Sequence, residues 1–289
     1  MSLSAFFTAK GRRMSPGATA VLMLPFFALL GFAFIYPIVS LLSISVLEPE
    51  PTLRHYAAVV ENPVFARVLW RTLRIALLVS LLSLVLAFPV AWLMAQSRGP
   101  KLAFITACVL LPFWSSVLVR TAAWAVILQR TGLVNESLQF LGITSEPVRL
   151  LYTQGAVVVA MTHVLMPFMV LPIYGVLRNI PKDYVRAASI LGAGPLRTFH
   201  EVILPLALPG ILSGFILVFL TALGYFITPA LLGSPTEMMI ATLISQQIRE
   251  VLDWPFAAAL VGVLTLFVTL IAMVFGKLMK FDRLMGAQA

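Results

Sequence analysis

Residues 75–97 read IALLVSLLSLVLAFPVAWLMAQS and contain no charged side chain. A helix rises about 1.5 Å per residue, so a run of this length can cross the roughly 30 Å hydrocarbon core of a bilayer. Further uncharged stretches of comparable or greater length lie at residues 14–47, 102–119, 150–177, 202–236 and 254–276. The pattern predicts an all-α, polytopic membrane protein.

The overall composition agrees with this fold class. Of the 289 residues, 61% are hydrophobic and 11% are charged, whereas soluble domains are about 45–50% apolar and about 25% charged. Long uniform stretches exclude a β-barrel, whose strands are short and alternate. The single cysteine, Cys108, excludes an internal disulfide and a cysteine-based metal cage. We expect one transmembrane domain over residues 1–289, with six helices at about 18–47, 72–95, 102–128, 155–177, 206–232 and 256–279.

The charge distribution predicts the orientation of these spans. If the N-terminus is inside and the spans alternate, the inside segments carry 12 Lys or Arg and three Asp or Glu, while the other 8 cations and 8 anions cancel. The net charge of +9 then lies on one side, which favours a membrane over nucleic acid as the partner and places both termini in the cytoplasm. A signal peptide is a poorer interpretation, because the uncharged stretch after Arg13 is much longer than an h-region of about 7–15 residues.

Proline is frequent within the expected spans. Eight of the 19 prolines lie there, namely Pro25, Pro37, Pro89, Pro112, Pro167, Pro172, Pro209 and Pro229. Each removes a helical hydrogen bond, and the freed carbonyl must find a neighbour or line a cavity. We expect kinked helices around a pathway, with ordinary helix packing as the alternative explanation.

The long inside loop, residues 178–205, has the pattern of a helical hairpin. Pro181 and Asp183 suit the first turn of a helix, and Gly192 and Gly194 suit its end. By spacing, one face of this helix comprises Tyr184, Ala187, Ala188 and Leu191. A second helix opening at Pro195 presents Leu196, Phe199 and Val202. An apolar helix face in a cytosolic loop implies a protein partner.

This loop resembles the EAA loop of permease subunits of type I bacterial ABC importers. The likeness rests on Ala187-Ala188, on Gly192 four residues later and on the ending Val202-Ile203-Leu204-Pro205. It implies the MetI-like permease fold, in which this loop is the coupling helix that docks on the ATPase subunit. The coupling residues so implied are Tyr184, Arg186, Ala187, Ala188, Leu191, Gly192, Pro195, Phe199 and Pro205. Arg186 stands where the family usually has Glu.

Three further segments resemble the spermidine/putrescine branch of these permeases. Residues 111–124, with Leu-Pro-Phe-Trp and Arg-Thr-Ala-Ala-Trp, look like its third span, residues 166–172 like its fourth and residues 222–233 like its fifth. Polyamine permeases often carry an acid where this chain has Tyr225. All eleven Asp and Glu lie in expected loops or at span edges, although a polycation would favour anionic or aromatic partners.

The candidate substrate-pathway residues are Trp114, Arg120, His163, Phe168, Tyr225 and Phe226. The Arg120 guanidinium suits an anionic or zwitterionic solute, but it could equally bond carbonyls freed by Pro112 or extend to the outside surface. His163 is either a packed hydrogen-bonding residue or a substrate ligand. The aromatic side chains form either a passage for an amine or ordinary membrane packing.

Enzymatic interpretations find no support. There is no Gly-x-x-x-x-Gly-Lys-Ser/Thr motif to cradle phosphates. The three histidines fall in an outside loop, a span and an inside loop, so they do not suggest one metal site. Ser115 and His163 form the one nucleophile–base pair worth naming, and nothing in the sequence orients the base.

The resemblance implies the partners and the mechanism. The chain would supply half of a pathway in the bacterial inner membrane, with a second, non-identical permease subunit, two ATP-binding subunits that hold ATP and Mg, and an external binding protein. The solute would be a polyamine or a related amine or amino-acid derivative, and no cofactor would bind this chain. A secondary transporter or channel working without ATP is the alternative, but we find no inverted repeat and no intramembrane acid. A membrane-anchored scaffold would not explain the eight span prolines.

Overall fold

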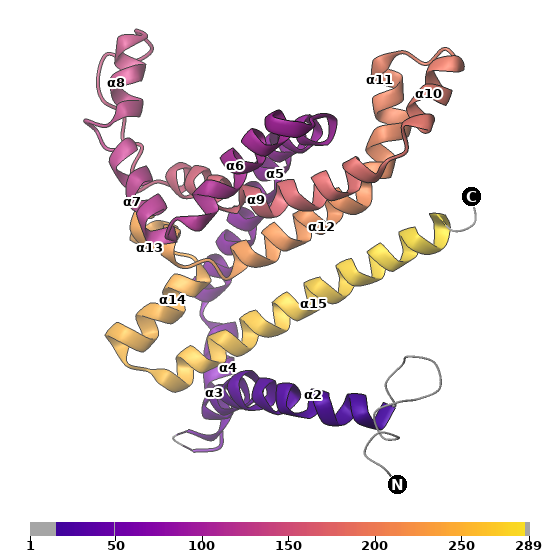
Figure 1. Cartoon of the computed structure of the whole chain (residues 1–289). Helices are drawn as coiled ribbons and strands as arrows, with labels where there is room; N and C mark the ends of the chain where they lie inside the picture. Colours follow the sequence, from indigo (N-terminus) through magenta and orange to yellow (C-terminus); the bar gives the residue numbers. More distant parts are fainter. Residues whose placement is uncertain (1–15, 49, 287–289) are drawn as a thin grey trace. The chain divides into compact units, whose positions relative to one another are not determined.

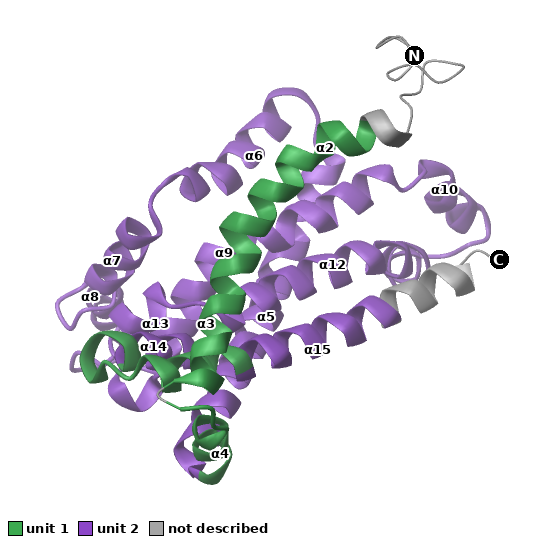
Figure 2. Cartoon of the chain, turned by 90° about the horizontal axis from the view of Figure 1, so that it is seen from below, with its two compact units in different colours: residues 1–61, 247–262 green, residues 62–246, 263–289 purple. Residues whose placement is uncertain are grey.

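The computed structural model describes the backbone of residues 16–48 and 50–286, and the side chains of residues 19–48 and 50–277. Every regular element in this part of the chain is a helix (Figure 1), which confirms the all-α prediction. The chain divides into two compact units. Residues 1–61 and 247–262 form the first, and residues 62–246 and 263–289 form the second (Figure 2).

Five helices among the described residues are long and apolar enough to cross a membrane. They are Thr19–Leu47, Pro63–Gln96, Gln154–Asn179, Pro195–Leu223 and Trp254–Lys277. The remaining expected span is a bent pair of helices, so up to six spans are present. The predicted number is therefore confirmed in outline, with corrections to the third and fifth spans.

The third span is not one helix over 102–128. It consists of α6 (Gly99–Trp114) and α7 (Val117–Ile127), which meet at an angle of 98°. Pro112 cannot donate a backbone hydrogen bond, and the Ser115 hydroxyl donates to the Pro112 carbonyl at 2.7 Å. This local bond competes with continuation of the helix, and the chain is extended at Ser115.

The fifth span is also interrupted, because the expected helix 206–232 is divided at residues 224–226. α12 (Leu204–Leu223) ends at Gly224, and α13 (Ile227–Leu232) starts anew. A helix running through this point would bring the Pro229 ring against the carbonyl of Tyr225. In the first turn of a new helix the missing N–H of Pro229 leaves no bond unmade, so the break accommodates it.

Two other prolines coincide with π-helical turns. η1 (Gly31–Ile35) joins α2 (Pro16–Leu30) to α3 (Tyr36–Leu47) and ends two residues before Pro37. η2 (Phe199–Ile203) joins α11 (Pro195–Thr198) to α12 and ends two residues before Pro205. Since proline lacks an N–H, the turn before it can widen without breaking a further hydrogen bond.

The core of the second unit is formed by α5 (Pro63–Gln96), α9 (Gln154–Asn179) and α12, which pack pairwise along their lengths. Small residues permit this approach. A Cβ on Gly210 would lie 2.9 Å from the Pro172 carbonyl oxygen, and one on Gly214 would lie 2.9 Å from Met169 Sδ. Such close contact of backbones is typical of membrane helices, whose association depends on packing because lipid is as apolar as leucine.

The first unit contains the N-terminal helices and a part of the chain far away in sequence. α4 (Arg54–Glu61) contributes Tyr56, whose hydroxyl hydrogen-bonds to the Ser45 hydroxyl of α3 at 2.8 Å. A Cβ on Gly262, in α15 (Trp254–Gly286), would lie 2.8 Å from the same Tyr56 hydroxyl. η4 (Gln247–Val251) precedes α15 in this unit.

Two of the connections between the spans hold short helices. α8 (Leu133–Phe140) lies in residues 129–154, and η3 (Pro235–Glu237) and α14 (Ile240–Gln246) lie in residues 233–255. The buried Asn135 side chain organises the first connection, donating to the carbonyls of Gln129 and Val148 at 2.9 and 3.0 Å. The buried Thr72 hydroxyl fixes the start of α14 to α5 by accepting the Ile240 N–H at 2.9 Å.

Candidate functional site

The predicted hairpin is present at residues 181–199. α10 (Lys182–Ile190) follows Pro181, and α11 begins at Pro195 (Figure 1). The turn is a Schellman motif, in which the Ala193 N–H donates to the Ala188 carbonyl at 2.9 Å and the Gly192 N–H donates to the Ser189 carbonyl at 3.0 Å. Gly192 has φ +80°, a conformation that residues with a Cβ rarely adopt.

The hairpin exposes an apolar tip, defined here as Tyr184, Ile190, Leu191 and Leu196. Leu191 is 86% exposed and Leu196 76% exposed, and Ala187 and Pro195 are exposed beside them. The sequence pattern overlooked Ile190, which is also 86% exposed. Its position one residue before Leu191 places it outside the i, i+3, i+4 stripe, although the last turn of a short helix exposes most of its circumference.

Two predicted docking residues point inward instead. Ala188 is buried and lies on the side of α10 that packs against α11 and η2. Phe199 is half-buried, with its ring centroid 5.7 Å from Phe88 and 5.9 Å from Trp92 of α5. They therefore anchor the hairpin to the helical core. The spacing rule groups residues on one helix but cannot say which of them a neighbouring helix covers.

Arg186 and Pro205, the remaining coupling candidates, are both exposed. The Arg186 guanidinium lies 3.3 Å from the Asp183 carboxylate on the same helix. Pro205 follows the π turn η2 and lies in the first turn of α12.

A second candidate region lies where α7, α9 and the link between α12 and α13 converge. We call Arg120, Trp124, His163 and Tyr225 the interior cluster, in which Arg120 is buried, Trp124 and Tyr225 are half-buried and His163 is exposed. Arg120 is only 9% exposed, and its Nε and Nη1 atoms have no hydrogen-bond partner among the described residues. Its charge interacts with both His163 and Tyr225, and the Trp124 indole N–H donates to His163 Nδ1 at 3.2 Å.

The structure brings together only some of the predicted pathway residues. Trp114 is 87% exposed and lies at the end of α6, outside the interior cluster. The Phe168 ring packs edge-on against Phe113 with centroids 5.3 Å apart. Phe226 is half-buried at the start of α13. Ser115 is exposed, and the lone pair of His163 Nδ1 accepts the Trp124 indole N–H, so this nitrogen is not free to act as a base toward Ser115.

Sequence reasoning missed the residues that hold this region in place. Thr121 and Thr228 are fully buried, and their hydroxyls lie 3.1 Å apart, joining α7 to α13. Both occur in the quoted motifs, next to Arg120 and Pro229, but a threonine in an apolar span gives no signal of its own. The sequence does offer an indirect indication, because each of these threonines lies directly beside an arginine or a proline within a span.

Comparison with known proteins gives a consistent result. The profile of the family described as "Binding-protein-dependent transport system inner membrane component" matches residues 66–281. The spermidine/putrescine transport system permease protein PotB of Escherichia coli (strain K12) is 33% identical over 226 residues, covering 78% of this chain and 82% of PotB. The inner membrane ABC transporter permease protein YdcU of the same organism is 35% identical over 248 residues, with 82% and 79% covered.

Solved structures show the same fold at lower sequence identity. A bacterial ABC transporter involved in the import of the acidic polysaccharide alginate gives a TM-score of 0.70 at 18% identity, covering 94% of this chain and 95% of the other. The MetNI methionine ABC transporter, in an inward-facing conformation, gives a TM-score of 0.56 at 18% identity and covers 75% and 95%.

Proposed function

Because this chain belongs to the family of binding-protein-dependent transport system inner membrane components, as a permease subunit of an ABC importer, we propose that it forms half of a solute pathway driven by a partner ATPase. The family and the multi-pass inner-membrane location are the premises, and they confirm the resemblance drawn from the EAA loop. The observation that carries the coupling proposal is the apolar tip of the hairpin. In this proposal the tip inserts into a groove of the ATP-binding subunit, which hydrolyses ATP with Mg.

The apolar tip supports an ATPase contact because of where it lies in the chain. Exposed apolar residues are expected on spans that face lipid. The tip instead follows Arg178 and Lys182, beyond the uncharged part of α9, where water is the alternative to a protein partner. Burying leucine-sized side chains gains about 1.5–3 kcal/mol each. Leu191 and Leu196 alone therefore supply a large part of a stable contact.

A double substitution tests this contact. We expect Leu191→Ser/Leu196→Ser to reduce co-purification of the ATPase by more than about tenfold, since each tenfold corresponds to about 1.4 kcal/mol. The unfolding temperature of the permease should not fall, because both side chains are exposed. Leu133→Ser/Leu141→Ser is the matched control, as these leucines are exposed on the connection expected outside. Normal ATPase binding by the first variant would contradict the proposal.

The orientation follows from the same proposal and has its own test. In a Cys108→Ser background, Lys182→Cys should resist a membrane-impermeant maleimide applied to intact cells, and Leu141→Cys should react. Both residues are exposed, and the charge distribution places residues 178–205 inside and residues 129–154 outside. Labelling of position 182 from outside would refute both the topology and the coupling role.

An external binding protein would dock at the outer end of α5. A cavity of about 600 Å³ there is lined by Arg67, Arg71 and Arg74, with Glu237 4.0 Å from Arg71. A surface with this excess of positive charge suits an acidic partner surface and speeds encounter. The proposed second permease, which is not identical to this chain, would complete the pathway.

For the solute, we propose a polyamine or a related amine or amino-acid derivative, on the strength of the likeness to PotB. The interior cluster bears on this choice, because the buried Arg120 repels a polycation and attracts a carboxylate. We expect Arg120→Gln to reduce uptake of a zwitterionic amino acid if Arg120 binds a carboxylate, with Arg130→Gln as the exposed control. A lower unfolding temperature with unchanged uptake of both an amino acid and spermidine would assign Arg120 a structural role.

A further inference from the structure

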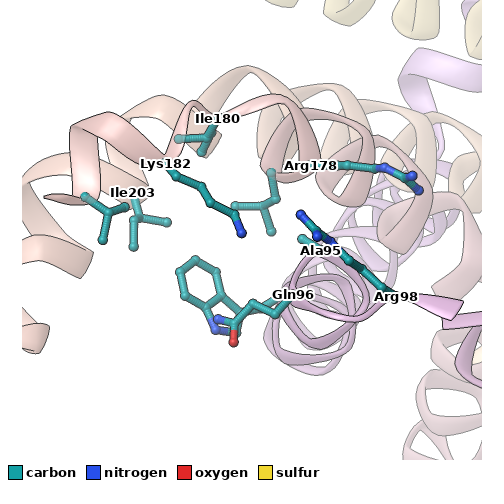
Figure 3. Close-up of a pocket in the computed structure, with 10 residues that line it drawn as sticks. Ala95, Gln96, Arg98, Arg178, Ile180, Lys182 and Ile203 are labelled. Atoms are coloured by element: carbon teal, nitrogen blue, oxygen red, sulfur yellow. The ribbon is translucent and has the colours of Figure 1, made fainter. Parts of the chain in front are cut away.

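A cavity of about 410 Å³ lies where the ends of α5 and α9 meet the start of α10. We call it the basic end pocket. Its charged lining consists of Arg98, Arg178 and Lys182, and its apolar wall includes Leu177, Val185 and Ile203. Figure 3 shows the side chains of Lys182 and Arg98 reaching into the space between the helices, while the end of Arg178 turns to one side. The volume is in the range of pockets that hold small ligands.

The pocket has positive charge without a matching acid. No Asp or Glu lines it, and no ion pair among the described residues involves its three cations. The nearby acids are engaged elsewhere, since Asp183 pairs with Arg186 and Glu201 pairs with Arg197 at 3.0 Å. Arg178 donates to the Tyr174 hydroxyl, which leaves Arg98 and Lys182 as donors for an anion. The start of α10 adds the partial positive charge of a helix N-terminus.

The depth of the pocket indicates which anion is available. Arg98 is the first charged residue after the uncharged stretch of α5, and Arg178 is the first after that of α9. Both positions fall where the hydrocarbon core ends and lipid headgroups begin. Trp92, which also lines the pocket, is of the type enriched at this interface. Basic pockets between spans at this level are suited to phosphate-bearing headgroups.

We propose that the basic end pocket binds the phosphate group of an anionic membrane lipid. Arg98 and Lys182 donate charge-assisted hydrogen bonds to the phosphate oxygens, and the apolar wall lies beside the start of the acyl chains. Because Arg98 lies in the turn after α5 and Lys182 is the first residue of α10, a bound lipid joins this turn to the base of the hairpin. The site requires only that the spans lie in a bilayer, so it does not depend on the solute or on the ATPase.

Native mass spectrometry of the delipidated full-length protein, titrated with dioleoyl phosphatidylglycerol, tests the site. We expect Arg98→Gln/Lys182→Gln to weaken binding by about tenfold or more, as loss of two charge-assisted bonds implies. The control Lys101→Gln/Arg197→Gln removes the same charge from exposed positions outside the pocket and should leave binding within about twofold. Arg98→Lys/Lys182→Arg keeps the charge and should retain binding, which separates a lost site from a lost fold.

Other outcomes would overturn the proposal. Equal affinity in the pocket variant and the control, or tight binding of phosphatidylcholine, would exclude an anionic lipid site here. Displacement of the lipid by millimolar inorganic phosphate would assign the pocket to a soluble phosphate. Retained lipid binding with lost ATPase co-purification would show that the two cations pair with acids of the partner protein. If transport fails while phosphatidylglycerol binding is intact, the result would support the lipid site and contradict only the proposed transport function.

Discussion

The α5–α9–α12 core and the hairpin at residues 181–199 differ in which residues they bury and which they expose. In the core, alanine, glycine and serine are buried, and hydroxyls such as those of Ser80 and Thr162 donate to carbonyls of their own helices at 2.8 and 2.7 Å. In the hairpin, leucine and isoleucine are exposed. Within lipid, packing distinguishes inside from outside, whereas apolar character does so only beyond the spans.

The difference shows which exposed apolar residues carry information. The helix α2 is exposed along its described side chains, with leucines and phenylalanines facing outward, and a bilayer accounts for them. The four residues of the apolar tip lie beyond the uncharged stretch of α9, after Arg178, so lipid does not account for them. Substitutions in the core should therefore change stability, and substitutions in the hairpin should change partner binding.

The largest effect is expected in the core, from Gly210→Val. A Cβ at this position would lie 2.9 Å from the Pro172 carbonyl oxygen and 2.9 Å from Val176 Cγ2. A backbone atom cannot rotate away, so α9 and α12 must separate, at a cost of about 1–3 kcal/mol or more. The unfolding temperature in detergent should fall by several degrees. Gly175→Val on α9 is the control, since no atom lies within 4 Å of its Cβ position. Equal losses in the two variants would contradict close packing at Gly210.

A buried hydrogen bond gives the next largest effect. Thr72→Val preserves shape but removes the acceptor of the Ile240 N–H, 2.9 Å away in a fully buried setting. An unsatisfied buried donor costs about 1–3 kcal/mol. Thr162→Val is the comparison, because the Thr162 hydroxyl only donates to a carbonyl of its own helix, and we expect less than about 1 kcal/mol there. Thermal unfolding measures both, and Thr72→Ser should restore the wild-type value.

Much of this architecture follows from local sequence. Uncharged runs predict the spans because a charge in lipid is costly, and Gly192 with Pro195 predicts the hairpin turn because few residues adopt its backbone conformation. The breaks at Ser115 and Gly224 could not be predicted with the same rules. A proline within a span either bends or ends its helix, and that choice depends on neighbouring helices, as the Thr121–Thr228 contact illustrates.

The candidate site could likewise be predicted from the sequence only in part. The existence of the hairpin was predictable, whereas the inward positions of Ala188 and Phe199 were not, because α5 and α11 decide which face is covered. Likewise, Arg120, His163 and Tyr225 lie far apart in sequence and are brought together by the bend between α6 and α7 and the break before α13. Sequence periodicity describes one helix at a time, so it cannot predict which residues of different helices come together.

In the hairpin, Gly192→Val should change function more than stability. No atom lies within 4 Å of the Cβ position, so the cost comes from φ +80° alone, about 1–2 kcal/mol for a left-handed residue. We expect ATPase co-purification and uptake to fall by about tenfold, with the unfolding temperature of the core unchanged. Asparagine tolerates this conformation better than valine does, so uptake by Gly192→Asn should lie between that of the wild type and that of the valine variant. Normal uptake by the valine variant would show that the turn can adopt another geometry without loss of coupling.

The smallest effect is expected from the ion pair on the hairpin surface. The carboxylate of Asp183 lies 3.3 Å from Arg186, with side chains 86% and 74% exposed. Exposed pairs contribute about 0.2–1 kcal/mol, so Asp183→Asn should leave unfolding and ATPase association unchanged within error. Arg186→Glu tests a different property, because it reverses the charge beside the apolar tip. If Arg186 faces an acidic groove on the ATPase, association should weaken in this variant alone, and added salt should reduce the difference. Equal behaviour of both variants at low salt would restrict Arg186 to its contact with Asp183 and leave the leucines of the tip as the determinants of docking.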